Sequence, residues 1–331
     1  MLDERWPDDV SDLASGLRAL LDKACGPEIV RGAESADDGR DAGLDERLDA
    51  FGIWELPASA PLLAAASWEM GRALAPVPYP ECATVLAVLG IRGATCGLEG
   101  AVPVPPRKTI VYDARNGDVL LADVTAPERR TSAGDLLAEP PDRGTSPAVG
   151  DADAGRRMEA LARLLHAARL TGAAERMLGS GVEHAKRRRQ FGRPIGSFQA
   201  VAHRLADAAI ALDGAGLLVR KTAWVSEPDQ GGDGTPSWAF APMVWAKAVE
   251  SGRLVASAVH QVMGGYGFTL EEDAQLSSRR IRSWTMRLPA AGPQLAALAR
   301  SLIDPVREGV RHLWQFDDGI RLPRWAAETD A

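Results

Sequence analysis

Cysteine is scarce in this chain of 331 residues, which contains only Cys25, Cys82 and Cys96. Their spacing provides no CxxC pair, and an odd, sparse set is not the framework of a disulfide-rich domain. Sparse cysteine is typical of proteins that work in a reducing compartment. We therefore expect a cytoplasmic protein without a zinc site or structural disulfides.

Long apolar runs and an excess of basic charge are also missing. No segment approaches the roughly 18 uninterrupted apolar residues of a membrane-spanning helix, and the acidic start MLDERWPDDV has no signal-peptide pattern. The chain has 38 basic and 45 acidic residues, a net charge of −7, whereas nucleic-acid surfaces hold phosphate with surplus Lys and Arg. We expect neither a membrane nor a nucleic acid as a partner.

The remaining composition, 46% hydrophobic and 25% charged, is that of a soluble globular protein. Patterning divides the chain into three parts, and we predict domains over residues 1–92, 93–150 and 151–331. The first and third carry apolar residues at helical spacing, and the second carries short β-prone runs. The predicted fold is mainly α with a small β domain: an N-terminal helical domain, a reduced β middle domain with a linker, and a C-terminal four-helix bundle.

Local signals place the elements within these parts. Ser11 is expected to cap the first helix, and the polar residues 31–47 interrupt the helical pattern. Asn116-Gly117 lies between two β-prone runs and predicts a hairpin turn, while residues 135–153, rich in Pro, Gly, Asp and Ser, predict a linker. Helices are expected at residues 13–21, 61–74, 82–91, 158–186, 198–212, 238–260 and 294–315, with an exposed loop at 227–237.

Two segments carry signals for chemistry. KRRRQFGRPIGSFQ, residues 186–199, places four consecutive cations at a helix end. Such a run is either a solvated face that complements the helix dipole or an anion site in which one guanidinium grips a phosphate. HQVMGGYGF, residues 260–268, has glycines that let a backbone approach a ligand, although a helix C-cap with a glycine turn also explains them. Because these glycines follow a helix rather than a strand, the Rossmann fingerprint does not apply.

Taken together, the two segments resemble the C-terminal domain of the acyl-CoA dehydrogenase family. The shared pattern is Arg188-x-Gln-Phe-Gly192, then Gln199, then Gln261-x-x-Gly-Gly-x-Gly267. The resemblance extends over about residues 155–285 and weakens in the N-terminal helices and in the middle part. It implies an FAD site shared between neighbouring subunits, with the flavin ring in one subunit and the adenine and pyrophosphate reaching the next.

The resemblance also assigns cofactor roles by position. Arg188 would bind the pyrophosphate of a partner's FAD, because a permanent cation suits a diphosphate. Phe191 would pack against the cofactor, and Gln199 would hydrogen-bond to its ADP half. The same end of the cofactor would be lined by Gln261, Gly264 and Gly265.

The catalytic base of the family is missing from this chain. Family members remove two hydrogens from an acyl-CoA thioester, and a glutamate takes the α proton. One family position for that glutamate falls near Leu288 and the other on Ala162, so neither holds a carboxylate. Glu159 would become the base only if the register shifted by one helical turn, and the alignment of Gly172 and Arg163 favours the unshifted register. Arg163 matches a family position near the substrate but has no base beside it in this register. We predict that this chain contributes no catalytic residue.

The middle part also lacks the family's Thr-Glu-Pro-type segment for the flavin ring. The chain therefore resembles the short, base-lacking subunit of actinobacterial heterotetrameric acyl-CoA dehydrogenases that degrade steroid side chains. This resemblance implies an α2β2 heterotetramer in which a catalytic acyl-CoA dehydrogenase subunit shares FAD with this chain. The substrate would be an acyl-CoA, and the shared site would have room for a polycyclic acyl group. An electron-transfer partner would complete the system. Alone, the chain would be inactive. Two other functions stay open: a cofactor-free assembly subunit, and a stand-alone acyl-CoA lyase or hydratase on the same fold.

Four further residues have weaker signals. His260 is expected to be a packed or capping histidine rather than a base. Three arginines would either meet CoA phosphates or form salt bridges between subunits. These are Arg279, Arg280 and Arg282.

Overall fold

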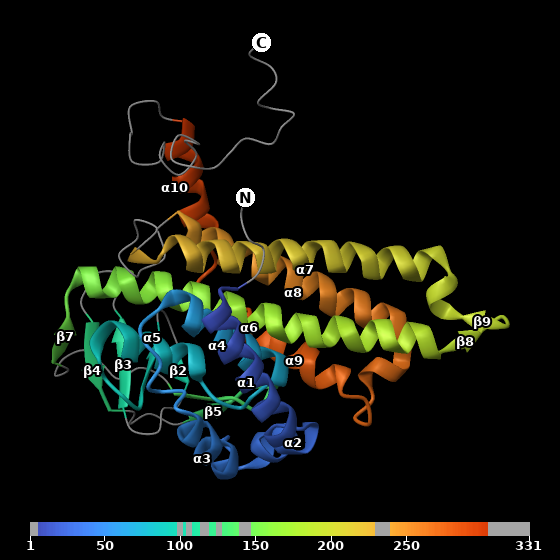
Figure 1. Cartoon of the computed structure of the whole chain (residues 1–331), viewed down its shortest axis with the longest axis horizontal. Helices are drawn as coiled ribbons and strands as arrows, with labels where there is room; N and C mark the ends of the chain where they lie inside the picture. Colours follow the sequence, from blue (N-terminus) through green and yellow to red (C-terminus); the bar gives the residue numbers. More distant parts are fainter. Residues whose placement is uncertain are drawn as a thin grey trace.

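The longest helix, α6 (Ala152–Arg187), is the central element of the fold (Figure 1). The computed structural model describes residues 6–97, 102–103, 108–112, 119–123, 128–138, 147–228 and 239–303. Asp151 caps α6 by accepting hydrogen bonds from the backbone N–H groups of Asp153 and Ala154. Lys186 and Arg187 complement the helix dipole at its other end. Most of the remaining helices pack against this one.

The N-terminal part is helical, as predicted. It contains α1 (Asp8–Ala24), α2 (Pro27–Ser35), α3 (Ala42–Phe51), α4 (Ala60–Ala73) and α5 (Tyr79–Leu89). The prediction that Ser11 caps the first helix is wrong. Helix α1 starts at Asp8 after Pro7, and the Ser11 hydroxyl donates to the Trp6 carbonyl at 3.2 Å.

The predicted interruption at residues 31–47 is also wrong, because α2 and α3 occupy most of that range. Each of these short helices buries only a few side chains, among them Val30 in α2 and Leu44 in α3. Asp41 caps α3 by accepting a hydrogen bond from the backbone N–H of Leu44. Helices with so narrow a buried face leave little periodicity in an otherwise polar sequence.

Two small sheets form the middle part. Their strands are β1 (Ala94–Gly97), β2 (Val102–Pro103), β3 (Lys108–Tyr112), β4 (Val119–Ala122), β5 (Glu128–Arg130), β6 (Leu136–Ala138) and β7 (Ala148–Gly150), in the orders β1-β3-β4-β7 and β2-β6-β5. Antiparallel pairing of β3 with β4, with Tyr112 opposite Val119, confirms the predicted hairpin pairing, and Asn116-Gly117 lies outside the described residues. The predicted linker at 135–153 is wrong where β6 and β7 pair with neighbouring strands, since pairing supplies hydrogen bonds that composition does not reveal.

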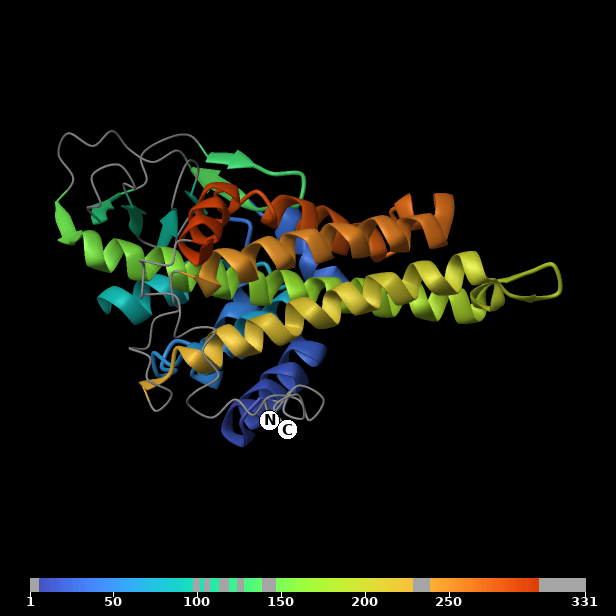
Figure 2. The same cartoon turned by 90° about the horizontal axis from the view of Figure 1, so that it is seen from above.

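Helices return in the C-terminal part. After α6 come the short strands β8 (Arg189–Gln190) and β9 (Arg193–Pro194), the 3-10 turns η2 (Ile195–Ser197) and η4 (Gly264–Phe268), and the helices α7 (Gln199–Val225), α8 (Phe240–Met263), α9 (Ala274–Trp284) and α10 (Gly292–Ile303). Helices α7 and α8 lie side by side over α6 (Figure 2). The predicted loop at 227–237 falls mostly outside the described residues.

The fourth helix packed against α6 and α8 is α9, and the prediction that residues 294–315 provide it is wrong. Within the described residues, α10 covers part of that range and meets α8 through Leu298, Ala239 and Met243. Helix α9 escapes sequence analysis because its polar residues outnumber its apolar ones. It nevertheless buries Leu276 and Trp284.

Helix α4 crosses α6 where two glycines face the opposing backbone. A Cβ atom on Gly71 would overlap the Arg169 carbonyl oxygen, and a Cβ atom on Gly172 would overlap the Trp68 carbonyl oxygen. Only glycine allows two helix backbones to approach this closely. This crossing fixes α6 against the N-terminal part.

The core beside α6 contains buried ionisable side chains. His166 Nε2 lies 3.6 Å from Glu81 Oε1, and Arg169 Nη1 lies 3.8 Å from Glu81 Oε2. The Arg169 guanidinium also donates to the Val77 carbonyl and stacks on the Trp284 ring at 3.7 Å. Burial lowers the pKa of His166 to about 4 against the opposing attraction of Glu81, so the imidazole is neutral at pH 7.

The described residues contain no helix long and apolar enough to cross a bilayer. They also contain no group of three or more His, Cys, Asp or Glu side chains placed to hold a metal ion. All three cysteines are buried and unbridged, and burial raises the pKa of Cys25 to about 11. Their thiols are therefore poorly reactive in the folded chain.

The helix crossing predicts that Gly172→Ala destabilises the protein, because the added methyl must push α4 away from α6. Overpacking of this kind costs about 1–3 kcal/mol. Gly179→Ala is the matched control: Gly179 lies on the exposed side of the same helix, and no other described part of the chain comes within 4 Å of its Cβ position. The control should be neutral or stabilise by up to about 1 kcal/mol. Urea denaturation followed by circular dichroism measures both, and equal midpoints for the two variants would contradict the prediction.

Neutral His166 predicts a loss of stability in acid. Between about pH 6.5 and pH 4 the unfolded chain binds a proton at this residue and the folded chain does not. The contribution of neutral His166 to the free energy of unfolding is therefore fully present above pH 6.5 and declines as the pH falls from 6.5 to 4. His166→Gln should flatten the stability curve there, while His203→Gln on the exposed side of α7 should leave it unchanged. Denaturation midpoints at half-unit pH steps give the measurement, and parallel curves for wild type and His166→Gln would refute it.

Candidate functional site

The arginine motif forms the end of α6 and a hairpin beyond it. Helix α6 ends at Arg187, and strands β8 and β9 pair antiparallel immediately after it. Phe191 and Gly192 are the two turn residues, with φ of +52° and +78°. Two successive left-handed residues make the tight turn that matches the twist of a two-residue hairpin. The hairpin projects from the end of the helical bundle (Figure 2).

Phe191 is both strained and exposed. A positive φ is unfavourable for a residue with a bulky side chain, and the side chain is 92% exposed. Its ring meets Phe198 edge-on at a centroid distance of 6.1 Å, and the Arg193 guanidinium covers Phe198 at 4.2 Å. An aromatic ring held in water by a strained backbone favours a binding role over a core role.

The glycine motif terminates α8. Gly264 has φ +61° and ψ −145°, a conformation open to glycine, and η4 follows directly. Nothing in the described ranges lies within 4 Å of the Cβ positions of Gly264 and Gly265. The His260 ring stacks on Phe268 at a centroid distance of 4.2 Å, which agrees with a packed histidine. The backbone of Gly264 and Gly265 is therefore open to close approach by a ligand.

The two motifs meet in a surface pocket of about 370 Å³. Arg188 and Gly265 line it together with His184, Met263 and Tyr266. Burial and the neighbouring cations lower the pKa of His184 against the attraction of Glu272, so its ring stacks on Tyr266 (centroid distance 5.7 Å) as a neutral group. Positive charge in the pocket therefore comes from the exposed Arg188.

The other predicted cofactor residues lie near this end of the bundle but outside the pocket lining. Gln199 is the exposed first residue of α7, and Gln261 is exposed in the last turn of α8. His184 and Tyr266 were not predicted. His184 lies one helical turn before Arg188, and Tyr266 follows Gly265 directly, so spacing from the two motifs could have identified them.

The two segments expected to carry a base lie against each other. Arg163 on α6 donates to the Pro289 carbonyl at 3.4 Å, and Trp245 Nε1 donates to the same carbonyl at 3.1 Å. Both positions that would hold the glutamate, Ala162 and Leu288, are buried apolar residues. In the described part of this region, no carboxylate stands at either position.

Glu159 reaches the same region, but its carboxylate is held by Arg163. The two side chains form an ion pair at 2.7 Å, one helical turn apart on α6. Arg163 is almost completely buried, whereas Glu159 is partly exposed. Removing the carboxylate would leave the buried Arg163 guanidinium without its ionic partner, which is destabilising.

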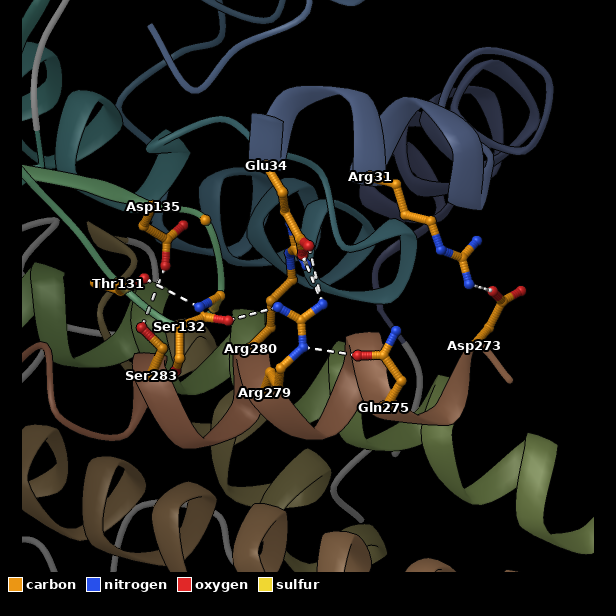
Figure 3. Close-up of polar contacts among 12 residues, drawn as sticks. Arg31, Glu34, Thr131, Ser132, Asp135, Asp273, Gln275, Arg279, Arg280 and Ser283 are labelled. Carbon is orange, nitrogen blue, oxygen red and sulfur yellow. Dashed lines mark hydrogen bonds and ion pairs between the residues drawn. The ribbon is translucent and has the colours of Figure 1, made fainter. Parts of the chain in front are cut away.

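A second polar network joins α2, the β5–β6 turn and α9 (Figure 3). Arg279 and Arg280 both pair with Glu34, and Arg279 also donates to the carbonyl of Ser132. Neither alternative predicted for Arg279 and Arg280, CoA phosphates or another subunit, included this partner: a carboxylate of the same chain pairs with both guanidinium groups. Arg282 remains exposed.

Arg287, directly before Leu288, extends this network to the β region. Its guanidinium pairs with Asp135 at 2.9 Å, and the Ser283 hydroxyl donates to the same carboxylate at 3.2 Å. Burial acts to raise the pKa of Asp135, but the attraction of Arg287, Arg169 and Arg280 outweighs it, so the pKa is lowered. An ionised, hydrogen-bonded pair thus joins α9 to the β region next to the expected base position.

Comparison with known proteins agrees with this geometry. Residues 157–293 match the family model for the C-terminal domain of acyl-CoA dehydrogenases. The acyl-CoA dehydrogenase IpdE2 of Mycolicibacterium smegmatis is 30% identical in an alignment that covers 86% of this chain and 96% of that protein.

Solved structures show the same fold. A chain of the ChsE4-ChsE5 complex from Mycobacterium tuberculosis superposes with a TM-score of 0.81 at 23% identity, covering 92% of this chain and 99% of that one. A chain of the Tcur3481-Tcur3483 steroid ACAD gives a TM-score of 0.77 at 22% identity, covering 88% and 97%. The sequence match to IpdE2 and the shared motifs place this chain in the acyl-CoA dehydrogenase family.

Proposed function

We propose that this chain is a non-catalytic subunit of a heteromeric, FAD-dependent acyl-CoA dehydrogenase, in which it completes the FAD site of a catalytic partner subunit. The observation that carries the proposal is a contrast between two regions of the chain. Its distal FAD motifs are open at a surface pocket, whereas its two base positions are closed by Ala162 and Leu288.

The residues at the pocket fit the phosphate end of FAD. Arg188 supplies a permanent, exposed cation, and the bare backbone at Gly264 and Gly265 allows close approach. Phe191 offers an apolar ring that this chain does not bury. Gln199 and Gln261 would add amide hydrogen bonds from α7 and α8.

We infer that the flavin ring does not bind in the region around the base positions of this chain. The Arg287–Asp135 pair and the buried Arg163 occupy the region where α6, α9 and the β region meet. In acyl-CoA dehydrogenation, bound FAD accepts a hydride from the β carbon of the thioester. A base must remove the α proton in the same reaction, and we propose that the partner supplies it.

The assembly we propose is an α2β2 heterotetramer that holds two FAD molecules. The solved structures with similar chains are named as pairs of different proteins, and one of them is named as a steroid enzyme, which supports a heteromer and a steroid side-chain CoA thioester as substrate. Each site would pair one catalytic chain with one copy of this chain. An electron-transfer partner would reoxidise the flavin.

Flavin stoichiometry tests the proposal. The chain should carry no flavin when purified alone, and one FAD per heterodimer when co-expressed with a catalytic acyl-CoA dehydrogenase. Native mass spectrometry and the visible absorbance of the flavin would measure the number of FAD molecules per chain in both preparations. One flavin per chain in a homo-oligomer would overturn the proposal. Turnover of an acyl-CoA by the chain alone without an electron acceptor would instead indicate a lyase or hydratase.

Arg188→Ala should weaken FAD binding in the co-expressed complex without preventing assembly. A charge-assisted hydrogen bond contributes about 1.5–3 kcal/mol, so the dissociation constant should rise roughly 10- to 100-fold. Arg187→Ala removes the same charge one residue earlier, where the guanidinium bonds to the Glu183 carbonyl, and should change affinity little. Flavin titration of the apo-complexes compares the two variants. Equal affinities would favour a cofactor-free assembly role.

A further inference from the structure

The buried face of α9 and the turn after it carry three side chains that donate hydrogen bonds and accept none. Arg280, Trp284 and Arg287 lie at positions i, i+4 and i+7, a spacing that keeps side chains on one face of a helix. Arg280 is 2% exposed, Trp284 is fully buried, and the side chain of Arg287 is 6% exposed. The backbone N–H of Arg287 bonds to the Trp284 carbonyl, which holds it at the end of the helix. We call these three residues the α9 donor row.

Several N–H groups of the α9 donor row have no partner in the described part of the chain. They belong to Arg280 Nε, Trp284 Nε1, and both Nε and Nη1 of Arg287. Arg169 of α6 adds its own Nε, and its guanidinium stacks on the Trp284 ring at 3.7 Å. Buried N–H groups in folded proteins nearly always have an acceptor, because an unpaired donor loses its hydration without replacement. This group of donors therefore requires an acceptor.

The donors gather around one carboxylate, that of Asp135 in the β5–β6 turn. Burial acts to raise the pKa of this carboxyl, but the attraction of Arg287, Arg169 and Arg280 lowers it, so all three guanidinium groups lie near it. Asp135 accepts from Arg287 Nη2 at 2.9 Å and from the Ser283 hydroxyl at 3.2 Å. That contact uses a single nitrogen of Arg287, so its other N–H groups need a second acceptor.

Positive charge exceeds negative charge by one among the described groups at this place. The groups are four guanidinium groups and three carboxylates, those of Arg169, Arg279, Arg280, Arg287, Glu34, Glu81 and Asp135. Glu34 is shared between Arg279 and Arg280, so its single charge does not neutralise both (Figure 3). Burial lowers the pKa of His166 to about 4, so the neutral imidazole adds no charge. A surplus charge inside a protein is unfavourable unless a counter-charge accompanies it.

We propose that a small monovalent anion of the halide class binds between the α9 donor row and Arg169 in the folded chain. An anion accepts hydrogen bonds and donates none, and hydrogen bonds to a charged acceptor are the strong ones. A buried water would bring further donors to a place already rich in them. The close packing of a protein interior favours an anion of one atom. The site lies within one chain and does not depend on the FAD role.

The dependence of stability on chloride tests the proposal. Urea unfolding of the full chain is followed by circular dichroism at constant ionic strength, while sodium chloride replaces sodium gluconate, whose anion is too large for this core. One ion that binds only the folded state raises the folded-to-unfolded ratio by up to about tenfold for each tenfold rise in its concentration. Bromide should act as chloride does. A folded-to-unfolded ratio that ignores both halides would overturn the proposal and leave water as the acceptor.

Trp284→Phe removes one donor and keeps an aromatic ring beside Arg169. Loss of a hydrogen bond to a charged group should raise the dissociation constant of chloride, fitted from the unfolding data, roughly 10- to 100-fold. Trp245→Phe is the matched control, because Trp245 is also buried but its Nε1 donates to the Pro289 carbonyl. The control should keep the wild-type chloride constant, whatever its effect on stability. The same constant in Trp284→Phe would place the ion elsewhere and overturn the proposal.

The anion site and the FAD role fail separately. Chloride-dependent stability in a chain that completes no FAD site with a partner would reject the FAD role alone. One FAD per heterodimer, with stability of the chain independent of halide, would reject the anion site alone.

Discussion

The close crossing of α4 and α6 determines where the candidate site lies. Because Gly71 and Gly172 have no side chains, the backbones of α4 and α6 pack directly against each other, and this close packing holds α6 in the core. Arg188 follows the crossing residue Gly172 by 16 positions, and the intervening part of α6, which ends at Arg187, packs against α8 at Gly181. The pocket with Gly265 exists because α8 ends beside that point.

Sequence reasoning succeeded where one pattern continued for many residues. The long helices α6, α7 and α8 have enough turns for their apolar faces to stand out, and β3 and β4 flank a strong turn signal. It failed at α2, α3 and α9, whose burial depends on ion pairs and neighbouring elements rather than on periodicity. The Glu34 contacts to Arg279 and Arg280 show why, because they join residues about 245 positions apart.

The residues of the candidate site also divide into those that the sequence could predict and those that it could not. Arg188 and Gly265 could be placed together from the sequence only through family resemblance, since no spacing rule connects the end of α6 with the end of α8. His184 and Tyr266 complete their pocket by local geometry. At the other end, the Arg163–Glu159 and Arg287–Asp135 ion pairs lie beside the two positions where the family resemblance would place a base. Removing one partner of a buried ion pair leaves the other charge uncompensated, which costs about 3–5 kcal/mol.

The hairpin that presents Phe191 also bears on how the cell handles the newly made chain. A nearly fully exposed aromatic ring, held by a backbone that cannot easily withdraw it, is the kind of surface that chaperones and proteases recognise. If the partner proposed above covers this ring, a copy made without that partner would keep Phe191 in water. The turn between β8 and β9 would then connect the fate of a newly made chain to the supply of its partner.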